Sequence, residues 1–514
     1  MGKKTRRILH AMFNRVTLAA LLLVIEILWL VVMVAGLSQY YIWIAPVFST
    51  ISMLIIADIL RRDNNPAYKM GWILLITLAP LFGWLTYAIF GNKHMTRRMH
   101  KRITAVEQAH TREPIRLSPI QEDKIPPRFL STTRYLSGFG GAPAHSNTDA
   151  KYYSLGDDMF PALLEAVAGA KRYVFMEYFI ISPGKMLDQL IDLLAQKAAE
   201  GVDVRIMYDD FGVRAPELSN FSQMMAKKGI RALPFNPIVP IFSIVVNHRN
   251  HRKITVIDGE IAFTGGINLA DEYINQKERF GHWKDTGLSL RGDAVQSYAI
   301  AFLNLWNAFK KTDDSYAPFM PQTDYTATSD APLLVQPYFD SPLDEENVGE
   351  NVYLEILAQA QQYVYIYTPY LIIDNEMQTA LCTAAKRGVD VRIVTPGIPD
   401  KKPVFQLTRS YYSVLLRAGV RIYEYTPGFL HAKSFLCDDK IATVGTINLD
   451  YRSLFLHFEC GALFYGGQAI HELLDDYHSV FMRSREIKSP SFGRARGMIG
   501  GLKEAILRAI APLL

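Results

Sequence analysis

One sequence motif that occurs twice constrains the fold of this chain more than any other feature. Each copy has a histidine, a lysine two residues later, an aspartate five residues after the lysine and an asparagine ten residues after the aspartate. The first copy consists of His251, Lys253, Asp258 and Asn268. The second copy consists of His431, Lys433, Asp438 and Asn448. A spacing that repeats at every position predicts a duplicated half-site, so the fold must bring two equivalent segments to one place.

A second repeat lies upstream of each copy and indicates the fold class. Residues 201–206 (GVDVRI) recur letter for letter at 388–393. Each occurrence is an apolar, β-branched segment after a periodic helical segment, which is typical of short strands covered by helices on both faces. We therefore expect an α/β fold with two lobes related by a pseudo-twofold axis. The lobes should span residues 130–320 and 325–488.

The N-terminal part of the chain is apolar enough to suggest a membrane-anchoring region. Three apolar stretches cover residues 16–37, 41–57 and 71–90. The first and third are about as long as a bilayer crossing needs. Pro80 and Gly83 interrupt the third stretch, so we expect it to be kinked or re-entrant. We predict that residues 1–100 form an α-helical membrane segment with an even number of crossings.

Charge and cysteine content favour the inner face of a cell membrane. Basic residues precede the first apolar stretch and follow the third, which keeps both flanks on the cytoplasmic side. Cys382, Cys437 and Cys460 have no metal-ligand spacing and suit a reducing compartment. We predict a multi-pass protein of the bacterial plasma membrane with cytoplasmic catalytic lobes. Residues 498–514 predict an amphipathic helix that either lies in the membrane interface or docks on the protein.

The duplicated residues suit chemistry at a phosphodiester. Such a reaction needs a nucleophile, a proton donor for the leaving alkoxide and positive groups on the non-bridging oxygens. Residues two apart on a strand share a face, so each copy should aim its histidine and lysine together, and both copies should surround one phosphorus. Asn268 and Asn448 would add amide donors. Thr446 would add a hydroxyl that its counterpart, Gly266, lacks.

The doubled motif resembles that of the phospholipase D superfamily, and the flanking residues look like those of bacterial cardiolipin synthases. The similar words are residues 247–253 (NHRNHRK), 408–412 (TRSYY) and 428–433 (GFLHAK). The resemblance implies two phospholipase D-like αβα sandwich lobes with one active site between them. It implies a phosphatidyltransferase that converts two phosphatidylglycerol molecules into cardiolipin and glycerol through a phosphohistidine, without a cofactor, metal ion or nucleotide.

The resemblance also implies roles for individual residues. The candidate catalytic residues are the histidine, lysine and aspartate of both copies. We take His251 as the nucleophile and His431 as the general acid and base, and the reverse assignment stays open. A carboxylate after the asparagine should orient each histidine, namely Glu459 for the second copy and Asp285 for the first. The two motif aspartates end their strands, so we expect them to support the site rather than transfer protons. His457 stands where the family usually has asparagine.

Alternatives remain at this stage. The same site could use water, as a phospholipase D does, or serine, as a phosphatidylserine synthase does. The apolar segments argue against a nuclease, so we expect membrane lipid and no nucleic acid as a partner. A scaffold that only binds anionic lipid would suit the net charge of +5 but would not need two intact motifs. Arg409, Tyr411 and Tyr412 either bind a headgroup or pack locally. The sequence shows no metal-binding phrase, and it leaves the oligomeric state open.

Overall fold

The computed structural model describes most of the chain and divides it into two compact units. The described residues are 41–63, 65–91, 96–110, 120–213, 215–237, 248–313, 315–322, 325–328, 333–344 and 346–489, with isolated positions near both ends. The first unit includes the N-terminal helices α3, α4 and α5, and the second unit includes both large sheets.

The helices of the first unit are divided by a proline. Helix α3 spans Tyr41–Arg61, α4 spans Pro66–Leu78 and α5 spans Pro80–Phe90. The proline ring at the start of α5 cannot continue the hydrogen-bond ladder of α4. The two helices lie so close that a Cβ atom on Gly83 would be 2.6 Å from the Cα atom of Ile76. The predicted kink within residues 71–90 is therefore confirmed.

The prediction of membrane-spanning helices is not supported in the same region. Among the residues that the structure describes, no helix is both long enough and apolar enough to cross a bilayer. Within residues 71–90 the reason is the break before Pro80, which leaves helices of 13 and 11 residues. The stretch 16–37 and the predicted helix at 498–514 lie mostly outside the described residues.

The first lobe is built on a seven-stranded mixed sheet with the order β1-β9-β7-β6-β2-β3-β4. In that order the strands span Thr148–Tyr153, Gly287–Gly292, Ile261–Gly265, Ile254–Ile257, Tyr173–Tyr178, Asp203–Asp209 and Arg231–Phe235. Strands β2, β3 and β4 are parallel to one another, and the remaining neighbours are antiparallel. The first histidine motif directly precedes β6, in the middle of the sheet.

The nine-stranded sheet of the second lobe repeats this order and adds β20 at one edge, giving β10-β19-β17-β16-β11-β13-β14-β20, and β5 (Arg249–Asn250) pairs with β19 off this path. In that order the strands span Leu333–Asp340, His457–Gly466, Ile441–Gly445, Ser434–Cys437, Tyr363–Tyr367, Asp390–Pro396, Arg421–Tyr425 and Ser484–Ile487. The repeated sequence segments at 201–206 and 388–393 lead into β3 and β13, which occupy equivalent positions in the two sheets. The predicted α/β fold with two lobes is therefore confirmed.

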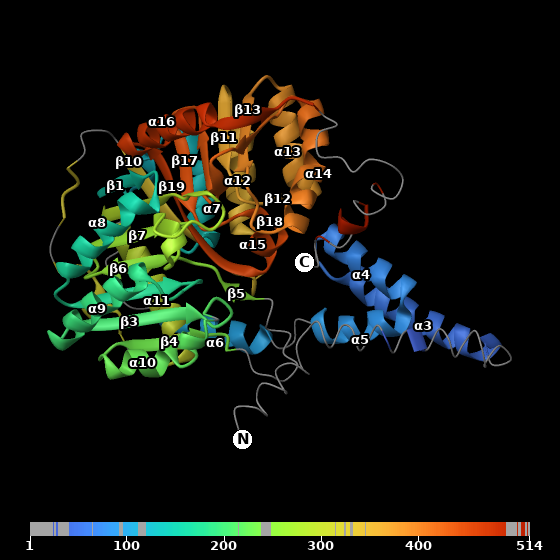
Figure 1. Ribbon diagram of the computed structural model, residues 1–514, viewed down its shortest axis with the longest axis horizontal. Helices are drawn as coiled ribbons and strands as arrows, with labels where there is room; N and C mark the ends of the chain where they lie inside the picture. The colour runs from blue at the N-terminus through green and yellow to red at the C-terminus, as the bar shows by residue number, and fades with distance from the viewer. Residues whose placement is uncertain are drawn as a thin grey trace. The chain divides into compact units, whose positions relative to one another are not determined.

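Helices cover the sheets because successive strand residues face opposite sides. From β2, Val174 and Met176 pack with α8 (Gly156–Ala168), α9 (Lys185–Ala199) and α10 (Phe221–Lys227), whereas Tyr173 and Phe175 pack with α11 (Val295–Phe309). In the second lobe, α16 (Gln468–Met482) joins the same core as α11. The other helices of this unit are most of α6 (Thr96–His110), which begins in the first unit, and α7 (Pro127–Phe139), α12 (Val348–Gln359), α13 (Asn375–Lys386), α14 (Lys402–Ala418) and α15 (Tyr451–Phe455) (Figure 1).

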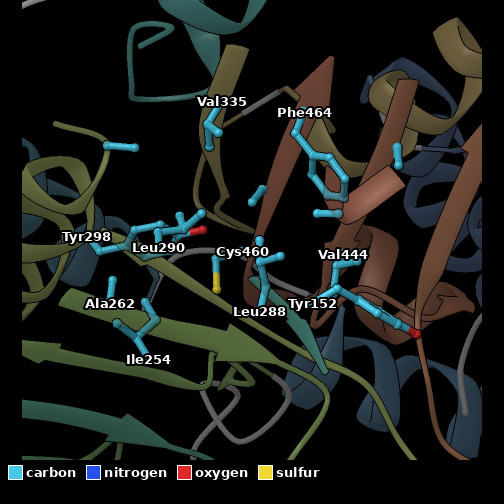
Figure 2. Packing of buried hydrophobic residues seen from close by; sticks show 14 of the residues in the cluster. Tyr152, Ile254, Ala262, Leu288, Leu290, Tyr298, Val335, Val444, Cys460 and Phe464 are labelled. Carbon is cyan, nitrogen blue, oxygen red and sulfur yellow. The ribbon is translucent and has the colours of Figure 1, made fainter. Parts of the chain in front are cut away.

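The two lobes share one apolar core. Side chains of the first lobe, such as Ile254 and Leu290, belong to the same buried cluster as Val444 and Phe464 of the second lobe. Figure 2 shows these groups meeting around Cys460. A buried aliphatic or aromatic side chain contributes about 1.5–3 kcal/mol, so a core of this extent fixes the lobes against each other. The site described below depends on that fixed arrangement.

Candidate active site

Each histidine motif lies between a short strand that pairs with the opposite lobe and a strand that belongs to the sheet of its own lobe. Before the first motif, β5 (Arg249–Asn250) pairs in parallel with the start of β19 in the second lobe. Before the second motif, β15 (Gly428–Leu430) pairs in parallel with β8 (His282–Lys284) of the first lobe. After each motif the chain joins its own sheet, as β6 or β16. The expected placement of the motifs on a continuous strand is therefore wrong, because the chain changes its hydrogen-bonding partner at this point.

Backbone hydrogen bonds attach both histidines to the opposite lobe. The amide of His251 donates to the carbonyl of Phe458 at 2.9 Å, and the amide of His431 donates to the carbonyl of Lys284 at 2.7 Å. Phe458 and Lys284 hold equivalent positions, since each immediately precedes a site carboxylate. The arrangement is therefore reciprocal, and neither lobe positions its own histidine alone.

The carboxylates that orient the histidines are exchanged between the lobes. The Nδ1 atom of His251 lies 2.9 and 3.0 Å from the two carboxylate oxygens of Glu459. The Nδ1 atom of His431 lies 2.6 Å from Oδ2 of Asp285. The sequence had indicated these two carboxylates but assigned each to the histidine of its own copy, and that pairing is wrong. It fails because β8 and β19 each pair with the strand that leads into the other lobe's motif.

Burial and charge leave both imidazoles neutral and both carboxylates ionised. Burial, opposed by Glu459, lowers the pKa of His251 to about 3, and burial together with Lys433 lowers the pKa of His431 to about 4. Burial opposes ionisation of Asp285 and Glu459, but the contacts with His431 and His251 and the charges of the two lysines outweigh it and lower the pKa of both carboxyl groups. A neutral imidazole that donates from Nδ1 keeps a lone pair on Nε2, which is the form that a nucleophile or base requires.

The two lysines are buried beside the histidines. The Nζ atom of Lys253 donates to the carbonyl of His251 at 2.5 Å, and Lys433 makes the same contact with His431. Burial lowers the pKa of Lys253 to about 7 and that of Lys433 to about 8. The positive charge of Lys433 contributes to the lowered pKa of Lys253, so the two ammonium groups from different lobes influence one another. Such a pair suits an anionic group bound between them.

The lobes differ at the residue after the turn glycine that both of them have, Gly265 in the first lobe and Gly445 in the second. In the second lobe, Thr446 donates its hydroxyl to Oε2 of Glu459 at 2.5 Å. In the first lobe, a Cβ atom on Gly266 would lie only 2.0 Å from Oδ1 of Asp285. Thr446 therefore stabilises the carboxylate of Glu459, whereas Gly266 leaves room for the carboxylate of Asp285. The sequence had indicated the difference but assigned the threonine hydroxyl to the phosphate.

The two asparagines are engaged in equivalent local contacts. The Nδ2 atom of Asn268 donates to the hydroxyl of Tyr273 at 2.8 Å, and that of Asn448 donates to the hydroxyl of Ser453 at 3.0 Å. The Oδ1 atom of Asn268 accepts the amide of Ile180 at 2.9 Å. Each amide nitrogen carries a second hydrogen, so the predicted contact with a phosphate oxygen stays a prediction.

The two motif aspartates lie away from the histidines and support the sheets. Asp258 accepts three backbone amides, from residues 171 to 173, each at 2.8 Å. Asp438 accepts the amides of residues 361 to 363 at 2.8–2.9 Å. Both aspartates adopt a positive φ, 54° and 52°. They anchor the starts of β2 and β11, which agrees with a supporting role.

Several residues shape the site in ways that sequence reasoning did not assign, although it had noted His457 in place of the usual asparagine. The ring of Trp283 lies 5.6 Å from that of His431, and the ring of His457 lies 5.6 Å from that of His251, at the equivalent position. Buried Asp209 binds the amide of Asn250 at 2.9 Å and the side chain of Arg249 at 3.2 Å, which fixes the strand before the first motif. The signal for Trp283 and His457 was their place two residues before each site carboxylate.

The residues considered for headgroup binding are used inside the second lobe. Arg409 makes two hydrogen bonds of 2.8 Å with the buried carboxylate of Glu424, and Tyr412 contacts the same carboxylate at 3.3 Å. Local packing is therefore the role that the structure supports for this segment. Among the described residues, one group could hold a metal ion, formed by His251, His457 and Glu459. No phrase in the sequence had indicated it, because its members come from both lobes.

Comparison with known proteins agrees with this geometry. The family described as "Cardiolipin synthase, PLD-like domain" matches residues 163–306 and 353–481, which cover both lobes. The chain belongs to this family. Residues 50–92 match a second family, described as "Phospholipase_D-nuclease N-terminal". The resemblance to the phospholipase D superfamily is therefore confirmed.

Individual relatives and a solved structure extend the family match. The chain is 42% identical to an uncharacterised protein of Streptococcus mutans over 86% of this chain and 96% of that protein. It is 34% identical to cardiolipin synthase 1 of Bacillus cereus, over 96% of this chain and 99% of that protein. The fold resembles phosphatidylserine synthase of Haemophilus influenzae, with a TM-score of 0.56, 14% identity, and coverage of 74% of this chain and 98% of that structure.

Proposed function

We propose that this member of the family is a cardiolipin synthase. It transfers a phosphatidyl group from one phosphatidylglycerol to the glycerol hydroxyl of another, and it releases glycerol. The observation that carries the proposal is the reciprocal pair of histidine–carboxylate contacts, Glu459 with His251 and Asp285 with His431. Two oriented imidazoles are what a two-step transfer through a covalent intermediate requires.

In the first step, Nε2 of His251 attacks the phosphorus and the bond to the leaving glycerol breaks. His431, in its protonated form, gives its proton to the glycerol oxygen. The bound phosphodiester anion and Asp285 both favour that protonated form. Lys253 and Lys433 offset the charge of the non-bridging oxygens, and the two asparagines add amide donors. In the second step, a hydroxyl of another phosphatidylglycerol gives its proton to His431, attacks phosphorus and releases His251.

The choice of His251 as the nucleophile is supported by the differences between the two halves. Both oxygens of Glu459 face Nδ1 of His251 at similar distances. By contrast, Nζ of Lys433 lies 2.7 Å from Nδ1 of His431 and competes with Asp285 for that position. The cleaner carboxylate contact favours the positive charge that His251 carries once it is phosphorylated. No nucleotide or metal ion is needed, because the phosphohistidine preserves the energy of the phosphoester.

We also infer that the chain works at a membrane, with the N-terminus and both lobes on the cytoplasmic side. The support is a lipid substrate class, the apolar residues 16–37, and exposed apolar side chains on α3 and α4, of which Trp43 and Leu78 are more than 70% exposed. Labelling of single cysteines placed near Arg15 and near Lys101 with an impermeant reagent tests the orientation. Neither site should react in intact cells. Reaction at the Lys101 site would put the lobes outside.

Purified protein with phosphatidylglycerol alone, without nucleotide or added metal, tests the reaction. We expect equal amounts of cardiolipin and free glycerol by mass analysis. Phosphatidic acid as the main product would indicate a phospholipase D instead. Phosphatidylserine made preferentially when serine is supplied would indicate a phosphatidylserine synthase. A requirement for a cytidine nucleotide-activated lipid would exclude the proposed mechanism.

A further inference from the structure

The group formed by His251, His457 and Glu459 has the composition of a zinc site. Two imidazole nitrogens and one carboxylate oxygen are a ligand set that zinc takes with a fourth position left open. The three candidate ligand atoms all lie within 4.8 Å of one another, and two of the three residues are buried. Imidazole ligands favour zinc and related transition metals over magnesium or calcium, which prefer oxygen.

The distances to one carboxylate oxygen suit a single shared ion. Oε1 of Glu459 lies 2.9 Å from Nδ1 of His251 and 3.7 Å from Nδ1 of His457. Ligands about 2.0–2.1 Å from a tetrahedral zinc are about 3.3 Å apart, and the two observed distances lie on either side of that value. Small side-chain movements would therefore be enough to accept the ion.

The surroundings of the group support coordination through Oε1. Thr446 holds the other oxygen, Oε2, with its hydroxyl, as supporting groups around metal sites do. The Nδ1 atom of His457 is buried and accepts no hydrogen bond from the described residues. Lys253 lies close enough to interact with Glu459 and opposes a cation, so we expect weaker binding than at a structural zinc site.

We propose that Zn²⁺ binds between His251, His457 and Glu459 and switches this site off. A metal on Nδ1 of His251 takes the place of the proton that Glu459 accepts. The single proton of the neutral ring then moves from Nδ1 to Nε2, so Nε2 has no lone pair with which to attack phosphorus. Binding of zinc therefore removes the nucleophile without displacing the histidine. The inference concerns an inhibitory ion and goes beyond the proposed reaction, which needs no metal.

Zinc titration of the full chain in detergent tests this proposal without reference to any lipid. The variants are His457→Asn, His457→Gln and, as a matched control, His471→Asn on the exposed face of α16. We expect the wild type and the control to bind one zinc ion per chain more tightly than either His457 variant, by at least about tenfold. Cobalt in place of zinc should give the visible spectrum of a tetrahedral ion only in the first two proteins.

A second readout measures the turnover of each protein in the presence of zinc, relative to the turnover of the same protein without zinc. Zinc should inhibit the wild type and the His471 control, with recovery after a chelator, and should inhibit the His457 variants only at concentrations at least tenfold higher. Equal zinc affinity in the wild type and both His457 variants would overturn the proposal, and so would no binding to the wild type. Failure to make cardiolipin would leave the binding result intact and would count only against the proposed function.

Discussion

Replacement of Glu459 by glutamine tests the crossed pairing through its cost to turnover. The change keeps the shape of the side chain and removes its charge. Glu459 is fully buried and receives two hydrogen bonds, from Nδ1 of His251 and from the hydroxyl of Thr446. A glutamine has one carbonyl oxygen for these two donors, so its amide nitrogen must face one of them.

Two effects set the size of the loss. Hydrogen bonds to a charged group contribute about 1.5–3 kcal/mol, against about 0.5–1.5 kcal/mol for neutral ones, so loss of the charge alone costs roughly tenfold in kcat. If the amide nitrogen faces His251, the ring is held with its proton on Nε2, and a comparable tautomer error in a serine protease triad costs about 10⁴-fold. We therefore expect kcat to fall by about 10-fold to 10⁴-fold, with little change in KM.

Cardiolipin formation from phosphatidylglycerol in mixed micelles, at saturating substrate, is the assay. Asp285→Asn is the reciprocal variant and should lose turnover to a similar extent, because it acts on the other histidine of the same centre. Thermal unfolding of both variants in detergent separates a catalytic loss from a loss of folding. A decrease of less than about fivefold in kcat for Glu459→Gln would refute the reasoning, because Glu459 would then not orient the nucleophile.

The remaining predictions concern other parts of the site. Because burial lowers the pKa of Lys253 to about 7 and of Lys433 to about 8, the free enzyme loses positive charge as pH rises through 7–8. In a plot against pH, kcat/KM should therefore fall between pH 7 and 8, and kcat should fall at a higher pH because a bound phosphodiester raises the pKa of both lysines. Lys253→Arg should extend activity to higher pH. A kcat/KM profile that is flat from pH 6 to 9 would contradict this role of the lysines. Gly266→Ala should displace the carboxylate of Asp285 and lower kcat by at least about 10²-fold. Thr446→Ala should lower kcat by only about tenfold in the same assay. Equal decreases in kcat would contradict the difference between the two lobes at this position. Asp258→Asn should lower the free energy of unfolding by about 2–4 kcal/mol and lower the melting temperature while kcat at low temperature persists; an unchanged melting temperature would contradict its anchoring role.

The sequence predicted the parts of this site that repeat at a fixed spacing. The histidines, lysines and asparagines could be identified because each half carries the same residues at the same intervals. The carboxylates, Asp285 and Glu459, follow their asparagines at different distances, so they were indicated by the family resemblance instead. The α/β lobes followed from apolar strands and the exact recurrence of residues 201–206 at 388–393. The break before Pro80 followed from local backbone chemistry, which does not depend on the rest of the fold.

The pairing between the halves could not be predicted from spacing. Glu459 follows the second motif by fewer residues than separate it from the first, so proximity in sequence favours the wrong histidine. The exchange depends on two short parallel ladders between lobes, β5 with β19 and β15 with β8, and strands of two or three residues carry no periodic signal. The approach of His457 to His251 arises from the same interlobe contact, so the sequence alone could not indicate it. The contact between Thr446 and Glu459 lies within the second lobe, where β17 pairs with β19.

Quantification of the covalent intermediate tests the central claim most directly, namely that two half-sites of one chain form a single reaction centre. Wild-type protein is mixed with phosphatidylglycerol labelled in the phosphatidyl group, quenched within a turnover and digested for peptide mapping. We predict at most one acid-labile phosphatidyl adduct per chain, and we predict that it lies on His251. Adducts on both His251 and His431 of the same chain would show that each lobe reacts independently and would contradict the account.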